Sequence, residues 1–234
     1  SIAVLISITF LLRVLGANLD KSQELLKREQ RLSQLLRTVT GINQLIVREQ
    51  DPHKLLSEAC ALLVSGREYS FAWVGLLEPD HVTLRLAAQA GDEIDPSLFN
   101  FRMDATARGL ACAVNAIKTR SFFRVTPGKE GDSCMGCPRR LTDPQRAGVA
   151  LPLLRDERAL GVLVVDHTTS SGVFDDEETH LLQDLANDLS YALEKIEVND
   201  RLQVYARHQT LLNEITQTAL EPPRLETMLQ KFIE

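Results

Sequence analysis

The strongest constraint on the fold is a change in the spacing of apolar residues along the chain. Near the start, Leu25, Leu32, Val39 and Ile46 recur every seven residues, as on one face of a helix. Between residues 69 and 78 the apolar side chains instead divide between two alternating faces, as they do in a strand. A chain that uses both periods is expected to pack helices against a sheet.

Four central segments have the alternating pattern of strands, and they pair into two hairpins around short polar turns. These segments are 69–78, 82–86, 148–154 and 160–167. A helix is expected at 107–118 and a short strand at 121–125. Hairpins flanked by helices predict a mostly antiparallel sheet covered by helices, which is an α+β fold.

A long helix is expected to begin directly after the last predicted strand. Asp175 is placed to cap this helix, and Glu178, three residues later, is placed to complete a capping box. In a capping box the two side chains satisfy each other's backbone N–H groups. The sequence therefore predicts that Glu178 turns back toward the start of the helix.

Both terminal helices carry the apolar spacing of a coiled coil. In the last helix, Leu182, Leu185 and Leu189 keep this spacing until polar Asn199, after which the pattern resumes out of phase at Leu202. A homodimer through the terminal helices is the natural interpretation. The alternative is that each helix lies on its own domain.

Three stretches of the central region resemble the GAF domain family. They are the Leu-Pro-Leu strand at 151–153, the Leu-Gly-Val-Leu strand at 160–163 and the Phe-Asp-Asp-Glu-Glu helix entry at 174–178. The resemblance covers residues 32–197 and implies a GAF-like (PAS/profilin-like) fold with long helices at both ends. It also implies a small-molecule or redox input module, of the kind commonly placed between a membrane span and an output domain.

Both ends of the chain are expected to connect this domain to other parts. Residues 1–16 begin with twelve uncharged residues and predict the C-terminal part of a transmembrane helix. Residues 17–50 are expected to form a juxtamembrane signalling helix, whose basic excess predicts the cytoplasmic side of the inner membrane. Residues 198–234 are expected to form a connecting helix and the start of a second GAF domain, since they echo the region around Asp51-Pro52.

Composition narrows the choice of partners. The net charge of -6 over 234 residues leaves no basic footprint for nucleic acid, so none is expected as a partner. Four cysteines are too few for a disulfide scaffold. A small-molecule ligand is expected instead, and the sequence requires no particular cofactor.

The pair Cys134 and Cys137 is the most informative local feature. Two thiols at this spacing can close a disulfide or supply two ligands to a metal. Arg139 and Arg140 follow directly and would favour a thiolate at Cys137. Cys112 and His167 could complete a site with them if the fold brings them close. Reversible oxidation, a metal or haem, contact with a ligand and an incidental surface pair all remain open.

Two aromatic residues are candidates for lining a pocket. Phe71 and Trp73 share one face of the first predicted strand, where they could stack on a planar ligand or form plain core. Cys60 and Cys112 lie among apolar residues and are expected to be buried. No catalytic residue is assigned.

The combined interpretation is the cytoplasmic GAF sensor of a membrane-bound signalling protein that acts as a homodimer. It binds a small molecule or senses redox state, and it passes the signal through its helices to an output domain of histidine kinase or diguanylate cyclase type. Enzyme activity is not expected of this segment. Two alternatives stay open: a thiol-dependent enzyme resembling the free methionine sulfoxide reductases, and a ligand-free structural or dimerisation module.

Overall fold

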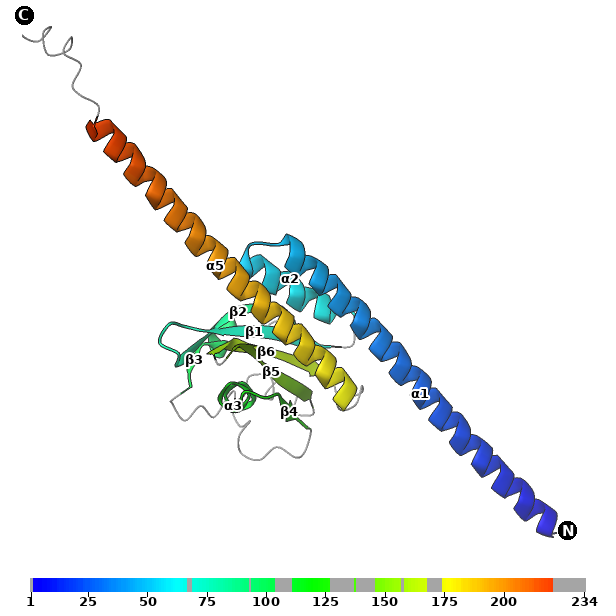
Figure 1. Cartoon of the computed structure of the whole chain (residues 1–234). Helices are drawn as coiled ribbons and strands as arrows, with labels where there is room; N and C mark the ends of the chain where they lie inside the picture. Colours follow the sequence, from blue (N-terminus) through cyan, green and yellow to red (C-terminus); the bar gives the residue numbers. More distant parts are fainter. Residues whose placement is uncertain are drawn as a thin grey trace, which may run out of the picture. The chain divides into compact units, whose positions relative to one another are not determined.

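The fold is described by a computed structural model (Figure 1). It covers residues 2–66, 69–92, 94–103, 111–126, 137, 146–156, 158–167 and 174–220. The chain divides into two compact units, Ser1–Ala192 and Leu193–Glu234. The whole sheet belongs to the first unit, together with every helix except the part of α5 beyond Ala192.

A six-stranded sheet forms the centre of the first unit, with the strand order β3-β2-β1-β6-β5-β4. Its strands are β1 Phe71–Leu77, β2 Thr83–Gly91, β3 Phe101–Arg102, β4 Phe123–Val125, β5 Ala147–Arg155 and β6 Arg158–His167. Every neighbouring pair is antiparallel. The two predicted hairpins are confirmed as β1–β2 and β5–β6, and β1 pairs with β6 at the centre of the sheet.

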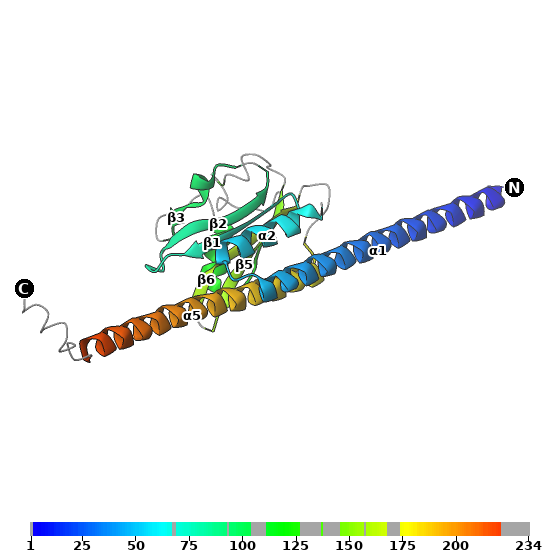
Figure 2. The ribbon, with the colours of Figure 1, turned by 90° about the horizontal axis from the view of Figure 1, so that it is seen from above.

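Helices cover both faces of this sheet, which confirms the predicted α+β fold. They are α1 Ile2–Arg48, α2 Pro52–Ser65, the short 3-10 helix η1 Pro96–Phe99, α3 Ala111–Thr119 and α5 Asp176–Leu220. Figure 1 shows α2 and α5 on one side of the sheet and α3 on the other, and the turned view of Figure 2 again places α2 beside α1. Asp51 fixes the start of α2, because its side chain accepts from the backbone N–H groups of His53 and Lys54.

The heptad series of α1 has two different surroundings. Leu35 and Ile42, which lie three residues after Leu32 and Val39 of that series, are buried within the first unit, whereas Leu25 is 56% exposed. The second half of α1 therefore lies on its own domain, as the alternative interpretation held. The first half of α1 is exposed, so the coiled-coil prediction now applies only to residues before about Leu32.

The phase slip in α5 has a structural explanation. Leu182, Leu185 and Leu189 are completely buried in the first unit, where they cover the sheet. In the second unit, Leu202 and Tyr205 are exposed by 60% or more. The early series thus packs on the chain's own domain, and the later series is left without a partner among the described residues.

The predicted membrane segment gains no support from the helices. Residues 2–16 form the beginning of α1, and that helix continues without a break to Arg48. No helix in the described part of the chain combines the length and the apolar character needed to cross a bilayer. Residues 221–234, where the second GAF copy is predicted to begin, lie outside the described residues.

The two central strands, β1 and β6, approach each other closely at Gly161 in β6. A Cβ atom at this position would lie 2.0 Å from the backbone oxygen of Gly75 in β1, and backbone cannot move aside as a flexible side chain can. We expect Gly161→Ala to lower the free energy of unfolding by about 1–3 kcal/mol in urea titrations. Gly16→Ala in α1, where nothing lies within 4 Å, is the matched control and should cause no loss. Equal effects of the two substitutions would contradict the close approach.

Candidate functional site

The structure brings four of the predicted site residues into one buried cluster. Phe71, Trp73, Cys112 and Cys137 all belong to the apolar core between the sheet and α3. The other three candidates, Cys134, Arg139 and Arg140, lie outside the described residues. We call this cluster and its polar edge the α3-side core.

The aromatic residues of the α3-side core pack on each other. The ring of Phe99 lies 4.9 Å from that of Trp73 and 5.9 Å from that of Phe71, measured between centroids. All three side chains are almost completely buried. Phe71 and Trp73 therefore contribute to the core, with η1 supplying the third ring.

The polar edge of the α3-side core holds a thiol, a guanidinium and a carboxylate. Arg146 donates through Nη2 to the sulfur of Cys137 at 3.4 Å, and through Nη1 to Oδ1 of Asp166 at 2.5 Å. Each of the three side chains is at most 3% exposed. The carboxylate of Asp166 balances the buried positive charge of Arg146, and the same guanidinium bonds the sulfur of Cys137.

Glycine makes room for this arrangement at position 148. A Cβ atom there would lie 2.5 Å from Oδ1 of Asp166 and 3.1 Å from Nη1 of Arg146. Gly148 is paired with Asp166 across β5 and β6, so the ion pair passes directly over its backbone. In the local sequence Arg146-Ala147-Gly148, the first residue supplies the cation and the glycine leaves the space that its side chain occupies.

The sequence analysis missed Arg146 and Asp166 as partners of Cys137. It assigned the stabilising cations to Arg139 and Arg140, which are closer in sequence. One signal was available: Asp166 interrupts the apolar run of a strand that the pattern already marked as buried, and a buried carboxylate requires a partner.

A second buried polar cluster lies on the opposite face of the sheet, at the start of α5. Oε1 of Glu178 accepts from the hydroxyl of Tyr69 at 2.9 Å and is hydrogen-bonded to Nε2 of His167 at 3.0 Å. The ring of His167 also contacts those of Tyr69 and Phe174, with centroids 4.8 and 4.3 Å away. All of these side chains are buried.

This second cluster corrects half of the predicted capping box. Oδ1 of Asp175 accepts from the backbone N–H of Glu178 at 2.8 Å, so Asp175 caps the helix as expected. The Glu178 carboxylate, however, turns inward to Tyr69 and His167. Two buried donors that need an acceptor outweigh one backbone N–H at the helix start, which water can satisfy.

The two remaining cysteines can also be placed. Cys60 in α2 is completely buried, and burial raises the pKa of its thiol to about 12, so it stays protonated at neutral pH. Cys112 in α3 is 2% exposed. Both are buried, as the sequence predicted.

A metal site with Cys112, Cys137 and His167 is not formed. His167 follows Asp166 directly in β6, and consecutive strand residues point to opposite faces of a sheet. His167 accordingly contacts Tyr69 and Glu178 on the α5 side. Within the ranges that the structure describes, no three His, Cys, Asp or Glu side chains are positioned to hold a metal ion.

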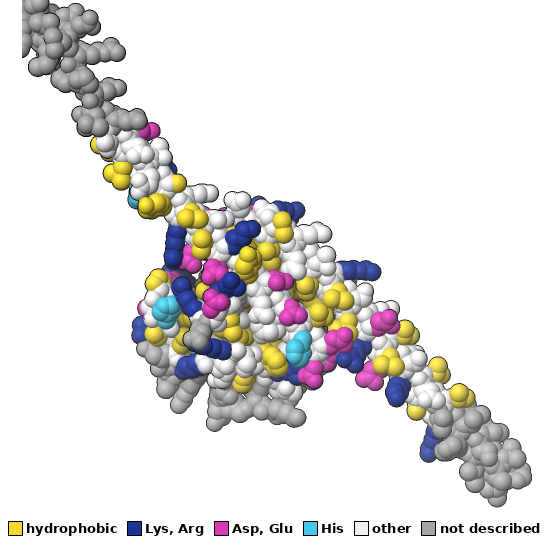
Figure 3. All heavy atoms as spheres, in the orientation of Figure 1, with side chains coloured by type: hydrophobic (Ala, Val, Ile, Leu, Met, Phe, Trp, Pro, Cys, Tyr) yellow, Lys and Arg dark blue, Asp and Glu magenta, His cyan; other side chains and the backbone are white. Residues whose placement is uncertain are grey.

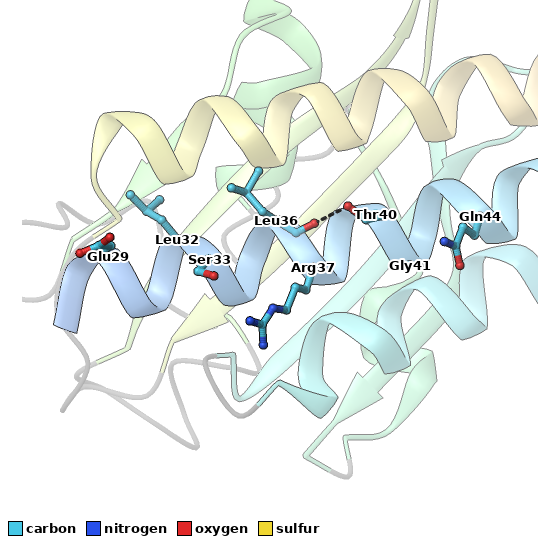
Figure 4. Close-up of a pocket in the computed structure, with 8 residues that line it drawn as sticks. All are labelled: Glu29, Leu32, Ser33, Leu36, Arg37, Thr40, Gly41 and Gln44. Carbon is cyan, nitrogen blue, oxygen red and sulfur yellow. Dashed lines mark hydrogen bonds between the residues drawn. The ribbon is translucent and has the colours of Figure 1, made fainter. Parts of the chain in front are cut away.

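An open groove runs along α1, away from the α3-side core. It is lined by residues of α1 alone, among them Leu32, Leu36, Arg37 and Gly41. Figure 4 shows Leu32 and Leu36 pointing toward α5, and Arg37 pointing toward α2. On the face drawn in Figure 3, acidic and basic side chains are interspersed over the described surface.

Comparisons with known proteins agree with this architecture. The family model described as "GAF domain" matches residues 49–194. A search of curated proteins finds no match.

Several solved structures share the fold at low identity. The free methionine-R-sulfoxide reductase from Neisseria meningitidis, in complex with its substrate, is 20% identical over 70% of this chain and 91% of its own, with a TM-score of 0.58. The GAF domain of a phosphoenolpyruvate-protein phosphotransferase from Coxiella burnetii is 15% identical over 72% and 98%, with a TM-score of 0.60. Residues 122 to 287 of a methyl-accepting chemotaxis protein are 17% identical over 67% and 97%, with a TM-score of 0.57.

The match to the family model extends over more than half of the chain and includes the sheet, α2, α3, the first part of α5 and the α3-side core. The chain therefore belongs to the GAF domain family, whose members are small-molecule-binding regulatory modules.

Proposed function

We propose that this chain is the sensory input module of a signalling protein, and that it responds to a small molecule or to oxidation at the α3-side core. The observation that carries the proposal is the buried contact between Cys137, Arg146 and Asp166. A thiol held beside a guanidinium is sensitive to any change of charge, because oxidation or an anionic ligand would compete for the same N–H donors. Such a change would displace the side chains of Arg146 and Asp166, and with them the adjoining strands β5 and β6.

The proposed output passes through the terminal helices of a homodimer. In the second unit, α5 exposes Val198, Leu202, Tyr205 and Leu212, which are separated by four, three and seven residues, as on a coiled-coil seam with polar Gln209 at one position. This seam begins two residues after Ile196, which is a rotation of roughly 200° around the helix from the buried series. A second copy of the same chain would bury these side chains in a symmetric pair.

The location and the output domain are further parts of the proposal. The uncharged first twelve residues and the basic flank after them support attachment to the inner membrane, with the GAF domain in the cytoplasm. The output would be of histidine kinase or diguanylate cyclase type. The chemotaxis-protein fragment of similar fold supports a role in signalling.

A thiol enzyme is the second candidate, and one observation favours it. The reductase from Neisseria meningitidis shares the fold, and the sulfur of Cys137 accepts a hydrogen bond from the guanidinium of Arg146. On this alternative the chain would reduce free methionine sulfoxide to methionine, with a dithiol as the reductant.

Mass spectrometry of the purified protein under non-denaturing conditions, before and after mild treatment with hydrogen peroxide, separates these candidates. For the sensor we expect a bound small molecule, or a loss of two protons mapped to Cys134 and Cys137, without turnover of methionine sulfoxide. Cys137→Ser should abolish the oxidative change, whereas Cys60→Ala should leave it intact. Formation of methionine that requires Cys137 would instead establish the enzyme. A protein that shows none of these changes would contradict both candidates.

The homodimer is tested by placing a charge on the exposed seam of α5. We expect Leu202→Glu to raise the dimer dissociation constant about 100-fold in sedimentation equilibrium, because two carboxylates would then face each other at an apolar contact. Gln203→Glu is the matched control, since it adds the same charge one residue away on the seam of the earlier phase. A wild-type chain that stays monomeric at high concentration would refute the dimer.

A further inference from the structure

We infer that Arg124 couples the α3-side core to the first turn of α5, so that a change on one face of the sheet reaches the helix on the other. The inference rests on the proposed sensory function and names the residue through which its signal would leave the core. Arg124 acts through Asp175, Asp176 and Thr179, and it is therefore a positioning residue.

The position of Arg124 in β4 places it between the two faces. Val125 is buried in the α3-side core, and Phe123 is packed against the same core. Because strand residues alternate, Arg124 points to the opposite face. β4 is a three-residue strand at the edge of the sheet, bonded only to β5 in the described sheet, so it can move with the core more easily than a central strand.

The guanidinium of Arg124 makes three hydrogen bonds to the start of α5. Nε donates to Oγ1 of Thr179 at 3.0 Å, and Nη2 donates to the backbone oxygen of Asp175 at 3.2 Å and to Oδ1 of Asp176 at 2.8 Å. These acceptors occupy fixed directions, and only the planar fork of an arginine can reach all of them at once. A displacement of β4 must therefore move the helix start or break the bonds.

Two of the three acceptors are held in place at the start of α5. The Thr179 side chain is completely buried, and its hydroxyl donates to the Asp175 oxygen at 2.6 Å while accepting from Arg124. The Arg124 guanidinium also holds the pKa of Asp176 below its ordinary value. The contact is thus made with the cap and the first full turn of α5, where α5 enters the domain.

The aromatic neighbour of Arg124 extends the same contact. The guanidinium lies over the ring of Phe122, 5.0 Å from its centroid, and that ring meets the ring of His180 edge-on at 6.3 Å. Residues Phe122 to Arg124 therefore contact α5 from its cap to His180.

Arg28 provides a natural comparison, because it binds the same turn from a different element. It is on α1 and forms ion pairs with Asp175 Oδ2 at 3.0 Å and Glu177 Oε2 at 3.3 Å. Its side chain is half exposed, and both of these ion pairs are to the start of α5 rather than to β4. Removing Arg28 loosens the turn without cutting its link to the α3-side core.

A double-mutant cycle read by hydrogen–deuterium exchange tests the inference on the 1–234 chain. Val125→Ala perturbs the α3-side core from within β4. In the wild-type background we expect it to speed amide exchange in the first two turns of α5 by about threefold to tenfold, relative to exchange in α2. In the Arg124→Ala background the same substitution should change exchange in α5 by a factor near one. In the Arg28→Ala background, Val125→Ala should again speed exchange in α5 by the same factor as in wild type.

Further variants keep the test decisive. Arg124→Lys, which retains the charge and loses the fork, should give a factor between those of wild type and Arg124→Ala. Phe123→Leu is the milder perturbation if the Val125→Ala double variant fails to fold by circular dichroism. The inference is wrong if Val125→Ala leaves α5 unchanged in wild type, or if its factor is the same in all three backgrounds.

The cycle uses neither ligand nor oxidant, and its result is therefore separate from that of the functional test. A protein that binds nothing and resists oxidation, but shows the coupling, would refute the sensor and leave the role of Arg124 intact. A protein that responds to peroxide without the coupling would refute the role of Arg124 alone.

Discussion

The double burial of β6 is the constraint on which the rest of the structure depends. The strand lies at the centre of the sheet, and every residue from Gly161 to His167 is buried. Its side chains alternate between two layers, with Val162 and Val164 in the α3-side core. Asp166 and His167 continue this alternation, so that one backbone segment carries the carboxylate of one polar cluster and the imidazole of the other. Neither cluster can shift without moving the strand that they share.

The two polar clusters differ in their effect on the stability of the core. A buried Arg–Asp pair rarely adds net stability over apolar residues of the same shape, because both charges lose their hydration. The pair is therefore weak evidence for stability, and its geometric effect is to position the guanidinium beside Cys137. The Tyr69–His167–Glu178 cluster instead satisfies hydrogen-bond donors and fixes where α5 begins. One face thus carries Cys137 with its ion pair, and the other carries the contacts that hold the start of α5.

The sequence predicted the fold better than the site, for a physical reason. Strand alternation and heptad spacing are local patterns, and they located both hairpins and the start of α5. The partners of Cys137 are joined to it only by folding, since Arg146 and Asp166 enter from β5 and β6. Glu178 was misjudged because the local capping rule competed with Tyr69, a residue 109 positions away that no spacing connects to it. The geometry of a helix cap depends on neighbouring residues in the sequence, whereas the burial of a hydrogen-bond donor depends on the whole fold.

The contacts at the start of α5 can act at a distance because α5 is a continuous helix. Arg28 from α1, Arg124 from β4 and the inward-turned Glu178 all hold the first turn of a helix that extends for 45 residues. Helices are stiff, and a rotation imposed at the first turn is carried along the axis unless a kink absorbs it. α5 contains neither proline nor glycine between Asp176 and Leu220. Within the first unit, a shift of this turn would therefore reach the buried residues of α5 that cover the sheet.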